Sequence, residues 1–430
     1  MIQSDPGIAY ESLYNQMEKL IVRPLNQSRI STVIVIDALD ECEDREPASA
    51  ILFVLGQLVS EIPKVKFFLT GRPEPRISEG FRLPLLAKMT DVFILHMVEA
   101  DQVDSDIRLF FKNGFSELAG RRRGLDNWPT EKQLDRLCGR AAGLFVYAAV
   151  TIKFIDNNKW DPKKQLNVIL RSRRIGNPEG KTLDSLYTSI LREAFGDDGP
   201  GYDARTRSVL SAVVLAVNPL SPSTIATLLG FDTEDVPPIL SSVNSLLILQ
   251  EDVDHPVRPF HKSFPDFVTD PTRCTNKRFH ISLPEHHLRL LIGCLDLMNR
   301  TLEKNICKLP DGVANSDVRD LKERTERYIN PALQYACMSW HMHLIDADKT
   351  PAHAPAITRT LRQFLEKKFL FWLEVLSVLG AVRNAVGALQ VTTDWLEVCR
   401  VSVLDASPEF TQTGYRSHWP SISPTIVSVS

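Results

Sequence analysis

Charged and hydroxyl side chains follow two short apolar runs of the chain. Asp37, Asp40 and Glu41 come after the run VIVI, and Thr70 and Arg72 come after the run FFL. A carboxylate such as Asp37 suits Mg²⁺ and would hold the ion of a bound nucleotide. Asp40 or Glu41 would polarise an attacking water, while Thr70 and Arg72 would sense a γ-phosphate, the arginine neutralising charge. The alternative is that these acids only begin a turn or cap a helix.

Two strands and a helix would position these side chains. The two apolar runs are continuous, which predicts strands covered on both faces, as in a parallel sheet. Residues 48–60 between them carry apolar side chains at helical spacing. Strand, helix and strand make a βαβ unit. Ligands of such sheets bind beyond the carboxyl ends of the strands, where the five polar residues would lie.

Three sequence blocks resemble one family of signalling proteins. VIVIDALDEC, followed by FFLTGRPEPRI, resembles the Walker B and sensor 1 segments of NACHT-type STAND NTPases, especially those of fungi. FHKSFPDF resembles the signature that ends the winged helix of these proteins. The resemblance implies a switch that is closed with ADP and oligomeric with ATP, so nucleotide and Mg²⁺ are the expected cofactors. It also implies that His261 reaches the β-phosphate of ADP. A structural hydrogen bond within the winged helix is the alternative role for His261.

The phosphate-binding loop of that family is missing from this sequence. The family places G-x-x-x-x-G-K-[ST] before Walker B, and no such motif precedes Val33. Gly180-Lys181-Thr182 is one residue short of the spacing, and we expect a surface loop there. We therefore interpret the chain as a truncated or degenerate NACHT module. Whether it is an enzyme stays open, and the missing loop argues against ATP hydrolysis.

The predicted fold is an α/β N-terminal part, which is a partial P-loop NTPase sheet, followed by mostly α-helical domains that include a winged helix. Residues 91–95 are expected to add a third strand. Three short helices and a hairpin after residue 200 predict the winged helix. The predicted domains are 1–118, the partial NACHT core; 119–200, a helical subdomain; 201–284, winged-helix-like; 285–405, C-terminal helical; and 406–430, a disordered tail.

The composition is that of an ordinary globular protein. The 430 residues are 43% hydrophobic and 24% charged, and the net charge of −3 argues against coating nucleic acid or an anionic membrane. The seven cysteines are scattered without a C-x-x-C pair, which indicates reduced thiols. No signal-peptide core and no apolar run of bilayer length is present. We expect a cytoplasmic protein that has no structural metal, since Cys337 and His341 lack a second ligand pair.

Three functions stay open at this point. The first is a degenerate nucleotide-binding signalling module, with protein partners or a homo-oligomer and an ancestral role in signalling or self/non-self recognition. The second is a protein-interaction scaffold that binds no nucleotide. The third is a complete NTPase whose first exon is missing from the sequence. A DNA-binding winged helix is disfavoured, because the predicted helix Pro222 to Leu229 carries no Lys or Arg.

Overall fold

The computed structural model describes residues 8, 11–28, 30–42, 47–157, 160–171, 181–196, 204–250, 252, 254–348, 350 and 354–405. Packing divides the chain into two compact units, Met1–Glu99 and Ala100–Ser430, and each is described by itself. Across the described ranges, no helix combines the length and apolar content that a bilayer-spanning segment needs.

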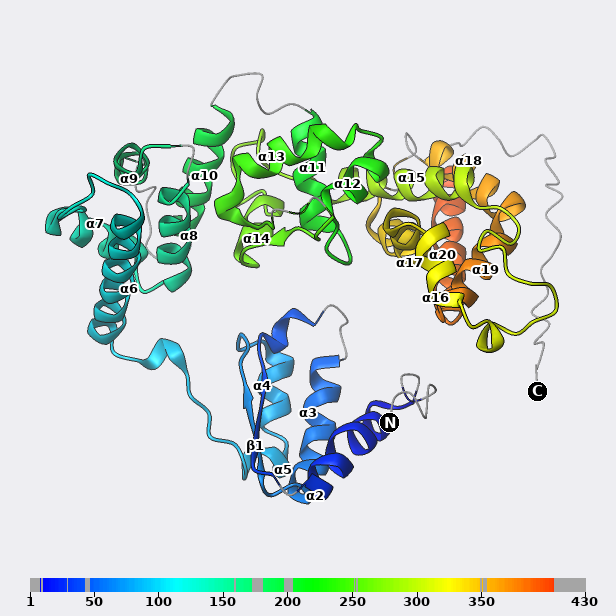
Figure 1. The fold of residues 1–430 in the computed structure, drawn as a ribbon, viewed down its shortest axis with the longest axis horizontal. Helices are drawn as coiled ribbons and strands as arrows, with labels where there is room; N and C mark the ends of the chain where they lie inside the picture. The colour runs from blue at the N-terminus through cyan, green and yellow to red at the C-terminus, as the bar shows by residue number, and fades with distance from the viewer. Residues whose placement is uncertain are drawn as a thin grey trace. The chain divides into compact units, whose positions relative to one another are not determined.

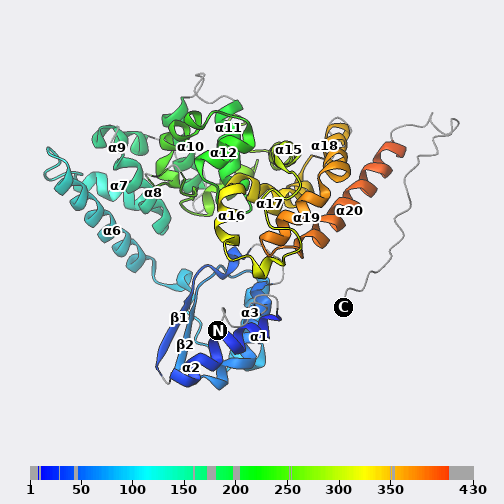
Figure 2. The same cartoon turned by 45° about the vertical axis from the view of Figure 1, so that its right-hand side comes forward.

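The first unit contains the βαβ unit that the sequence predicts. β1 (Thr32–Ile36) and β2 (Val65–Leu69) pair in parallel, with Ile36 beside Leu69 at their carboxyl ends. Their branched and aromatic side chains favour strands. α3 (Pro47–Leu58) connects them and lies beside them in Figures 1 and 2. The other elements of this unit are α1 (Leu13–Met17), the π-helix η2 (Glu18–Val22), α2 (Arg23–Ser28), the 3₁₀ helices η3 (Leu39–Glu41), η4 (Val59–Glu61) and η5 (Leu95–Met97), α4 (Pro75–Phe81) and α5 (Pro84–Ala87).

Among the described residues of this unit, one face of the two-stranded sheet is covered and the other is not, so the prediction of strands buried on both faces is wrong. Ile34 and Ile36 pack on the buried cluster that the helices of this unit form. Val33 and Val35 point the other way and are each 62% exposed, and Phe68 is 59% exposed. An apolar run shows only that both faces of the strand carry apolar side chains. Burial of both faces also requires a second layer of helices on the opposite face.

The predicted third strand at 91–95 is also wrong. Residues 91–94 have no regular secondary structure, and Leu95 begins η5. Val92, Phe93 and Leu95 are 68%, 77% and 75% exposed. A strand exists only where a neighbouring backbone pairs with it, and β1 and β2 are the two members of the sheet in the described part of this unit.

The second unit is mostly helical. α6 (Ala100–Arg121) packs on α7 (Glu131–Ala141) and α8 (Phe145–Ile155), and it runs across the predicted domain boundary at residue 118. The predicted boundaries at 118, 200 and 284 stay predictions. The further helices are α9 (Pro162–Arg171), α10 (Lys181–Phe195), α15 (Leu283–Thr301), η8 (Asn315–Asp317), α16 (Leu321–Tyr328), α17 (Pro331–Asp346), α18 (Ala354–Lys367), α19 (Phe369–Val378) and α20 (Asn384–Asp405).

The segment predicted as a winged helix has the expected order of elements. Three α-helices and a short antiparallel pair follow one another, with two 3₁₀ helices between them and a fourth α-helix after them: α11 (Ala204–Leu215), α12 (Pro222–Leu229), η6 (Thr233–Asp235), α13 (Val236–Ser242), η7 (Asn244–Leu246), β3 (Leu247–Ile248), β4 (Arg258–Pro259) and α14 (Ser263–Thr269). Ser221 caps α12 by accepting from the N–H of Thr224, with Pro222 at the first position. The assignment of this block as a winged helix stays a prediction.

Aromatic packing joins the C-terminal helices. Trp340 of α17, Phe364 of α18 and Trp372 of α19 are fully buried and meet edge to face, at centroid distances of 5.4 to 5.9 Å.

Two predictions from the sequence concern segments that lie wholly or partly outside the described residues. Lys181 and Thr182 begin α10 instead of lying in a surface loop, while residues 176–180 and 406–430 lie outside the described residues.

Candidate functional site at the strand ends

Asp37 and Thr70 lie side by side at the carboxyl ends of β1 and β2. Because the register pairs Ile36 with Leu69, the next residue of each strand faces its counterpart. The Thr70 hydroxyl donates to Oδ1 of Asp37 and accepts from the backbone N–H of Ala38 at 2.9 Å. The Asp37 carboxylate is therefore held in one orientation at the edge of the sheet, and Asp37 itself is exposed.

Asp40 and Arg72 form the second contact between the two strand ends. Oδ1 of Asp40 accepts from the backbone N–H of Arg72 at 3.0 Å, and Oδ2 lies 3.5 Å from Nε of the same arginine. The Asp40 side chain is 4% exposed, while that of Arg72 is 47% exposed. Asp40 thus fastens the chain after β2 to the chain after β1, and the Arg72 guanidinium extends towards solvent.

A strained residue turns the chain between these two contacts. Ala38 has a φ of 53°, in the left-handed region that non-glycine residues rarely adopt. The conformation costs roughly 1 kcal/mol or more and persists where surrounding bonds enforce it. Here the N–H of Ala38 donates to Thr70, and its carbonyl accepts from the N–H of Glu41 at 2.8 Å. The turn places Asp40 inward and leaves Glu41 exposed at the end of η3.

His261 lies in the second unit, just before α14. Its Nδ1 accepts from the backbone N–H of Ser263 at 3.1 Å and lies 2.7 Å from the Ser263 hydroxyl. That hydroxyl lies 2.7 Å from the hydroxyl of Tyr187 on α10. The structural hydrogen bond that was one of the two expectations for His261 is therefore present, and it uses Nδ1.

The structure brings five of the six predicted site residues together at one edge. Asp37, Asp40, Glu41, Thr70 and Arg72 belong to the first unit, whereas His261 belongs to the second. Sequence reasoning missed the connection from His261 to Tyr187. The two residues that carry it, Tyr187 and Ser263, are 76 positions apart, and no spacing rule links them.

The residues at the strand ends fit a nucleotide-bound Mg²⁺ in part. The Asp37 carboxylate and the Thr70 hydroxyl supply the oxygen ligands that Mg²⁺ prefers. The sequence adds no G-x-x-x-x-G-K-[ST] loop that would surround the phosphates. Within the described part of the chain, no group of three or more His, Cys, Asp or Glu side chains is arranged to hold a metal ion by itself.

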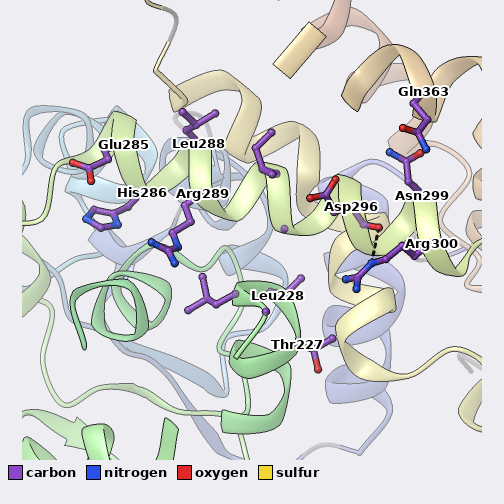
Figure 3. A pocket seen from close by; sticks show the side chains of 14 residues that line it. Thr227, Leu228, Glu285, His286, Leu288, Arg289, Asp296, Asn299, Arg300 and Gln363 are labelled. Atoms are coloured by element: carbon purple, nitrogen blue, oxygen red, sulfur yellow. Dashed lines mark hydrogen bonds between the residues drawn. The ribbon is translucent and has the colours of Figure 1, made fainter. Parts of the chain in front are cut away.

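A cavity of about 750 Å³ lies elsewhere, in the second unit (Figure 3). It is lined by the C-terminal end of α12 at Leu228, by α15, and by Gln363 of α18. Its charged lining residues are Arg289, Arg300, Glu285 and Asp296, and Arg300 Nε donates to the Asp296 carbonyl at 3.2 Å within α15. None of the six predicted site residues lines this cavity.

Comparisons with known proteins give two matches. Residues 1–72, which include β1, β2 and the ends of both strands, match the family model described as Nephrocystin 3, N-terminal. The chain is also similar to "Vegetative incompatibility protein HET-E-1" of Podospora anserina, at 26% identity over 382 residues. That match covers 84% of this chain but 26% of the relative, so the chain spans about a quarter of the curated protein. No solved structure gives a significant match.

Proposed function

Because these matches confirm the resemblance to fungal NACHT-type proteins, we propose that the chain is a nucleotide-controlled signalling module of the NACHT/STAND class. It binds ADP or ATP with Mg²⁺ at the edge formed by β1 and β2. The observation that carries the proposal is the hydrogen bond from Thr70 to Asp37, which joins the two motif segments at that edge. Such an edge is where ligands of parallel sheets bind.

Each side chain at the edge has a role in this proposal. Asp37 binds Mg²⁺, directly or through water, and the ion supplies positive charge beside the phosphates. Thr70 orients the Asp37 carboxylate and senses the γ-phosphate. Arg72, whose guanidinium is half exposed, neutralises phosphate charge.

The contacts also assign different roles to the two neighbouring acids. Asp40 is buried and fastened to Arg72, so it shapes the turn. Glu41 is exposed and is the acid that would polarise a water. Nucleotide binding, and not turnover, is the core of the proposal, because it rests on the edge formed by β1 and β2.

His261 is proposed to donate to a phosphate of ADP, the role that the family resemblance implies for it. An imidazole suits this role because it donates a hydrogen bond yet releases the phosphate when the domain moves. The relative is named a vegetative incompatibility protein, and we extend that class of role, signalling in self/non-self recognition, to this chain. Its partners are then other proteins or further copies of itself.

A protein-interaction scaffold is the second candidate, favoured by one observation. Val33, Val35 and Phe68 form an exposed apolar strip on the uncovered face of the sheet. Exposed apolar patches often mark sites of protein association. The two candidates differ in nucleotide binding, since a scaffold would associate with partners whether or not ADP is present.

The test is a titration of the full chain with a fluorescent ADP analogue in the presence of Mg²⁺. We expect saturable binding by the wild-type chain and at least tenfold weaker binding by Asp37→Asn, since the carboxylate loses its charge. Asp91→Asn is the matched control: it removes an exposed carboxylate in the same unit, and its affinity should equal that of the wild type. Equal affinities for Asp37→Asn and wild type, or no binding by either, would overturn the proposal.

A further inference from the structure

The direction of the hydrogen bonds around His261 is determined by a backbone amide. The N–H of Ser263 points at Nδ1 of His261 at 3.1 Å, and an amide N–H can only donate. Nδ1 must therefore be the unprotonated nitrogen that accepts. A neutral imidazole with an unprotonated Nδ1 carries its proton on Nε2.

The same constraint orders the two hydroxyls. Because Nδ1 accepts, the Ser263 hydroxyl, 2.7 Å from it, must donate to it. The Ser263 oxygen then accepts from the Tyr187 hydroxyl, which also lies at 2.7 Å. The chain of donors runs from Tyr187 through Ser263 to His261. Each bond in such a chain polarises the next and strengthens it.

The two hydroxyl residues are held firmly. Tyr187 is fully buried and Ser263 is 8% exposed. The Tyr187 ring packs against Phe264 and Phe267 of α14, both with centroids 5.5 Å away. Close by, Arg273 pairs with Asp184 of α10, with the shortest N–O distance at 2.7 Å. These contacts fix α10 against α14, so the donor chain is part of a rigid region.

We propose that Tyr187 and Ser263 are positioning residues, which hold the imidazole of His261 in one orientation as the Nε2–H tautomer. The ring proton is then on Nε2, so a contact of that nitrogen with an anionic group would be a donated hydrogen bond. That this group is a phosphate of ADP rests on the proposed function. The donor chain itself does not, because it follows from contacts within the second unit.

The donor chain also links parts of the molecule that the sequence assigns to different domains. Tyr187 lies before the predicted boundary at residue 200 and His261 lies after it. A movement that separates α10 from α14 would remove the Tyr187 hydroxyl from Ser263. His261 would then lose the support for its orientation, so release of the ligand and separation of the helices would occur together.

The experiment records ¹⁵N resonances of the histidine rings in the full chain, at about pH 8.5, where an ordinary histidine is neutral. The His261 signals are assigned by their loss in His261→Gln. We expect the wild-type ring to show a protonated Nε2 and a hydrogen-bonded, unprotonated Nδ1. In Ser263→Ala the Nδ1 resonance should move part of the way towards that of a nitrogen without a bonded donor, because the hydroxyl is lost while the backbone N–H still donates, and Ser263→Thr should restore it. Tyr187→Phe, which keeps the ring packing, should produce a smaller shift in the same direction.

Tyr335→Phe is the matched control. Tyr335 makes another buried bond to a histidine, 2.7 Å from its hydroxyl to Nε2 of His343, in the same unit. Its loss should leave the His261 resonances unchanged. A wild-type ring with its proton on Nδ1, or His261 resonances that do not respond to Ser263→Ala and Tyr187→Phe, would overturn the proposal.

Measuring ADP affinity on the same variants separates this inference from the proposed function. If ADP binds, Tyr187→Phe and Ser263→Ala should each weaken it roughly threefold or more, as expected for a misoriented donor. If no variant binds ADP but the ring signals shift as described, the proposed function fails and the positioning role of Tyr187 and Ser263 stands.

Discussion

Thr70 donates its hydroxyl to the carboxylate of Asp37 across the ends of two parallel strands, and this bond joins the two motif segments of the chain. It exists because the sheet register places Ile36 beside Leu69. The same hydroxyl accepts from the N–H of Ala38, whose left-handed backbone would otherwise leave that group unpaired. One side chain thus supports both the orientation of the carboxylate and the turn that follows β1.

Replacing Thr70 tests this double role. In Thr70→Val the shape is kept but both bonds are lost, and we expect the free energy of unfolding to fall by about 1 kcal/mol in chemical denaturation. Thr70→Ser keeps the hydroxyl and should retain most of the stability. If Thr70→Val and Thr70→Ser are equally stable, the hydroxyl does not support the turn.

Asp40 and Glu41 should respond differently to substitution. Asp40→Ala removes a carboxylate that is 4% exposed and accepts from the backbone N–H of Arg72, so we expect a loss of roughly 1–3 kcal/mol in stability. Glu41→Gln changes an exposed side chain and should alter stability by less than about 0.5 kcal/mol. Denaturation of both variants by urea measures the difference.

For ATP hydrolysis, in contrast to stability, Glu41 should matter more than Asp40. If a slow hydrolysis of Mg-ATP is detectable, Glu41→Gln should remove it without unfolding the chain. Asp40→Asn keeps an acceptor for the Arg72 N–H and should leave part of the rate. Hydrolysis that survives Glu41→Gln but disappears in Asp40→Asn would reverse the assignment of the two acids.

Buried histidines make the second unit sensitive to acid. Burial lowers the pKa of His343 to about 3 and that of His286 to about 4. Both groups are neutral when folded, and the unfolded chain binds protons below its ordinary pKa of about 6.5. Their contribution to stability is therefore complete above about pH 6.5 and is lost as the pH falls. For each histidine, the free energy of unfolding should fall by up to about 1.4 kcal/mol per pH unit as the pH decreases between about pH 6 and 5.

The variant His286→Gln tests the contribution of His286 to this pH dependence of stability. The Nε2 of His286 has no hydrogen-bond partner among the described residues, so replacing His286 removes one titrating group without breaking a hydrogen bond of that nitrogen to these residues. We expect a smaller loss of stability from pH 6.5 to pH 5 than in the wild type, measured by urea denaturation at each pH. Equal slopes for both proteins would show that His286 is not buried and neutral.

Gly293 permits a close approach of α15 to α12. A Cβ at this position would lie 2.1 Å from the Leu228 carbonyl oxygen. Gly293→Ala should therefore destabilise the second unit by about 2 kcal/mol or more. Gly120 of α6 is the control, because a Cβ there meets nothing within 4 Å. Gly120→Ala should raise stability by about 0.5–1 kcal/mol, and equal effects of the two variants would contradict this packing.

Local sequence patterns predict which helices and strands form in this fold better than they predict what packs against each of them. The βαβ unit and the cap at Ser221 follow from short stretches of sequence, and the structure contains them. The exposure of Val35 and Phe68 could not be predicted, because it depends on whether a helix covers the second face of the sheet. Residues 91–95 have the composition of a strand, but in the described part of the first unit no neighbouring backbone pairs with them.

In the candidate site, too, some features follow from local sequence and others depend on tertiary structure. The positions of Asp37 and Thr70 follow from the rule that parallel strands end at one edge of a sheet. The different surroundings of Asp40 and Glu41 depend on the left-handed turn at Ala38, which the sequence does not signal because Ala is an unusual residue for that conformation. The contact from Tyr187 to Ser263 depends on tertiary packing of α10 on α14.

The measurement that tests the central claim most directly is the nucleotide content of the purified chain. Residues 1–430 are purified, unfolded, and the released small molecules are separated and quantified as ADP and ATP. The account predicts nucleotide in amounts comparable to the protein, reduced in Asp37→Ala and in His261→Ala. A well-folded chain that releases none, and whose melting temperature does not rise with added Mg-ATP or Mg-ADP, would contradict nucleotide binding and leave the scaffold as the better account.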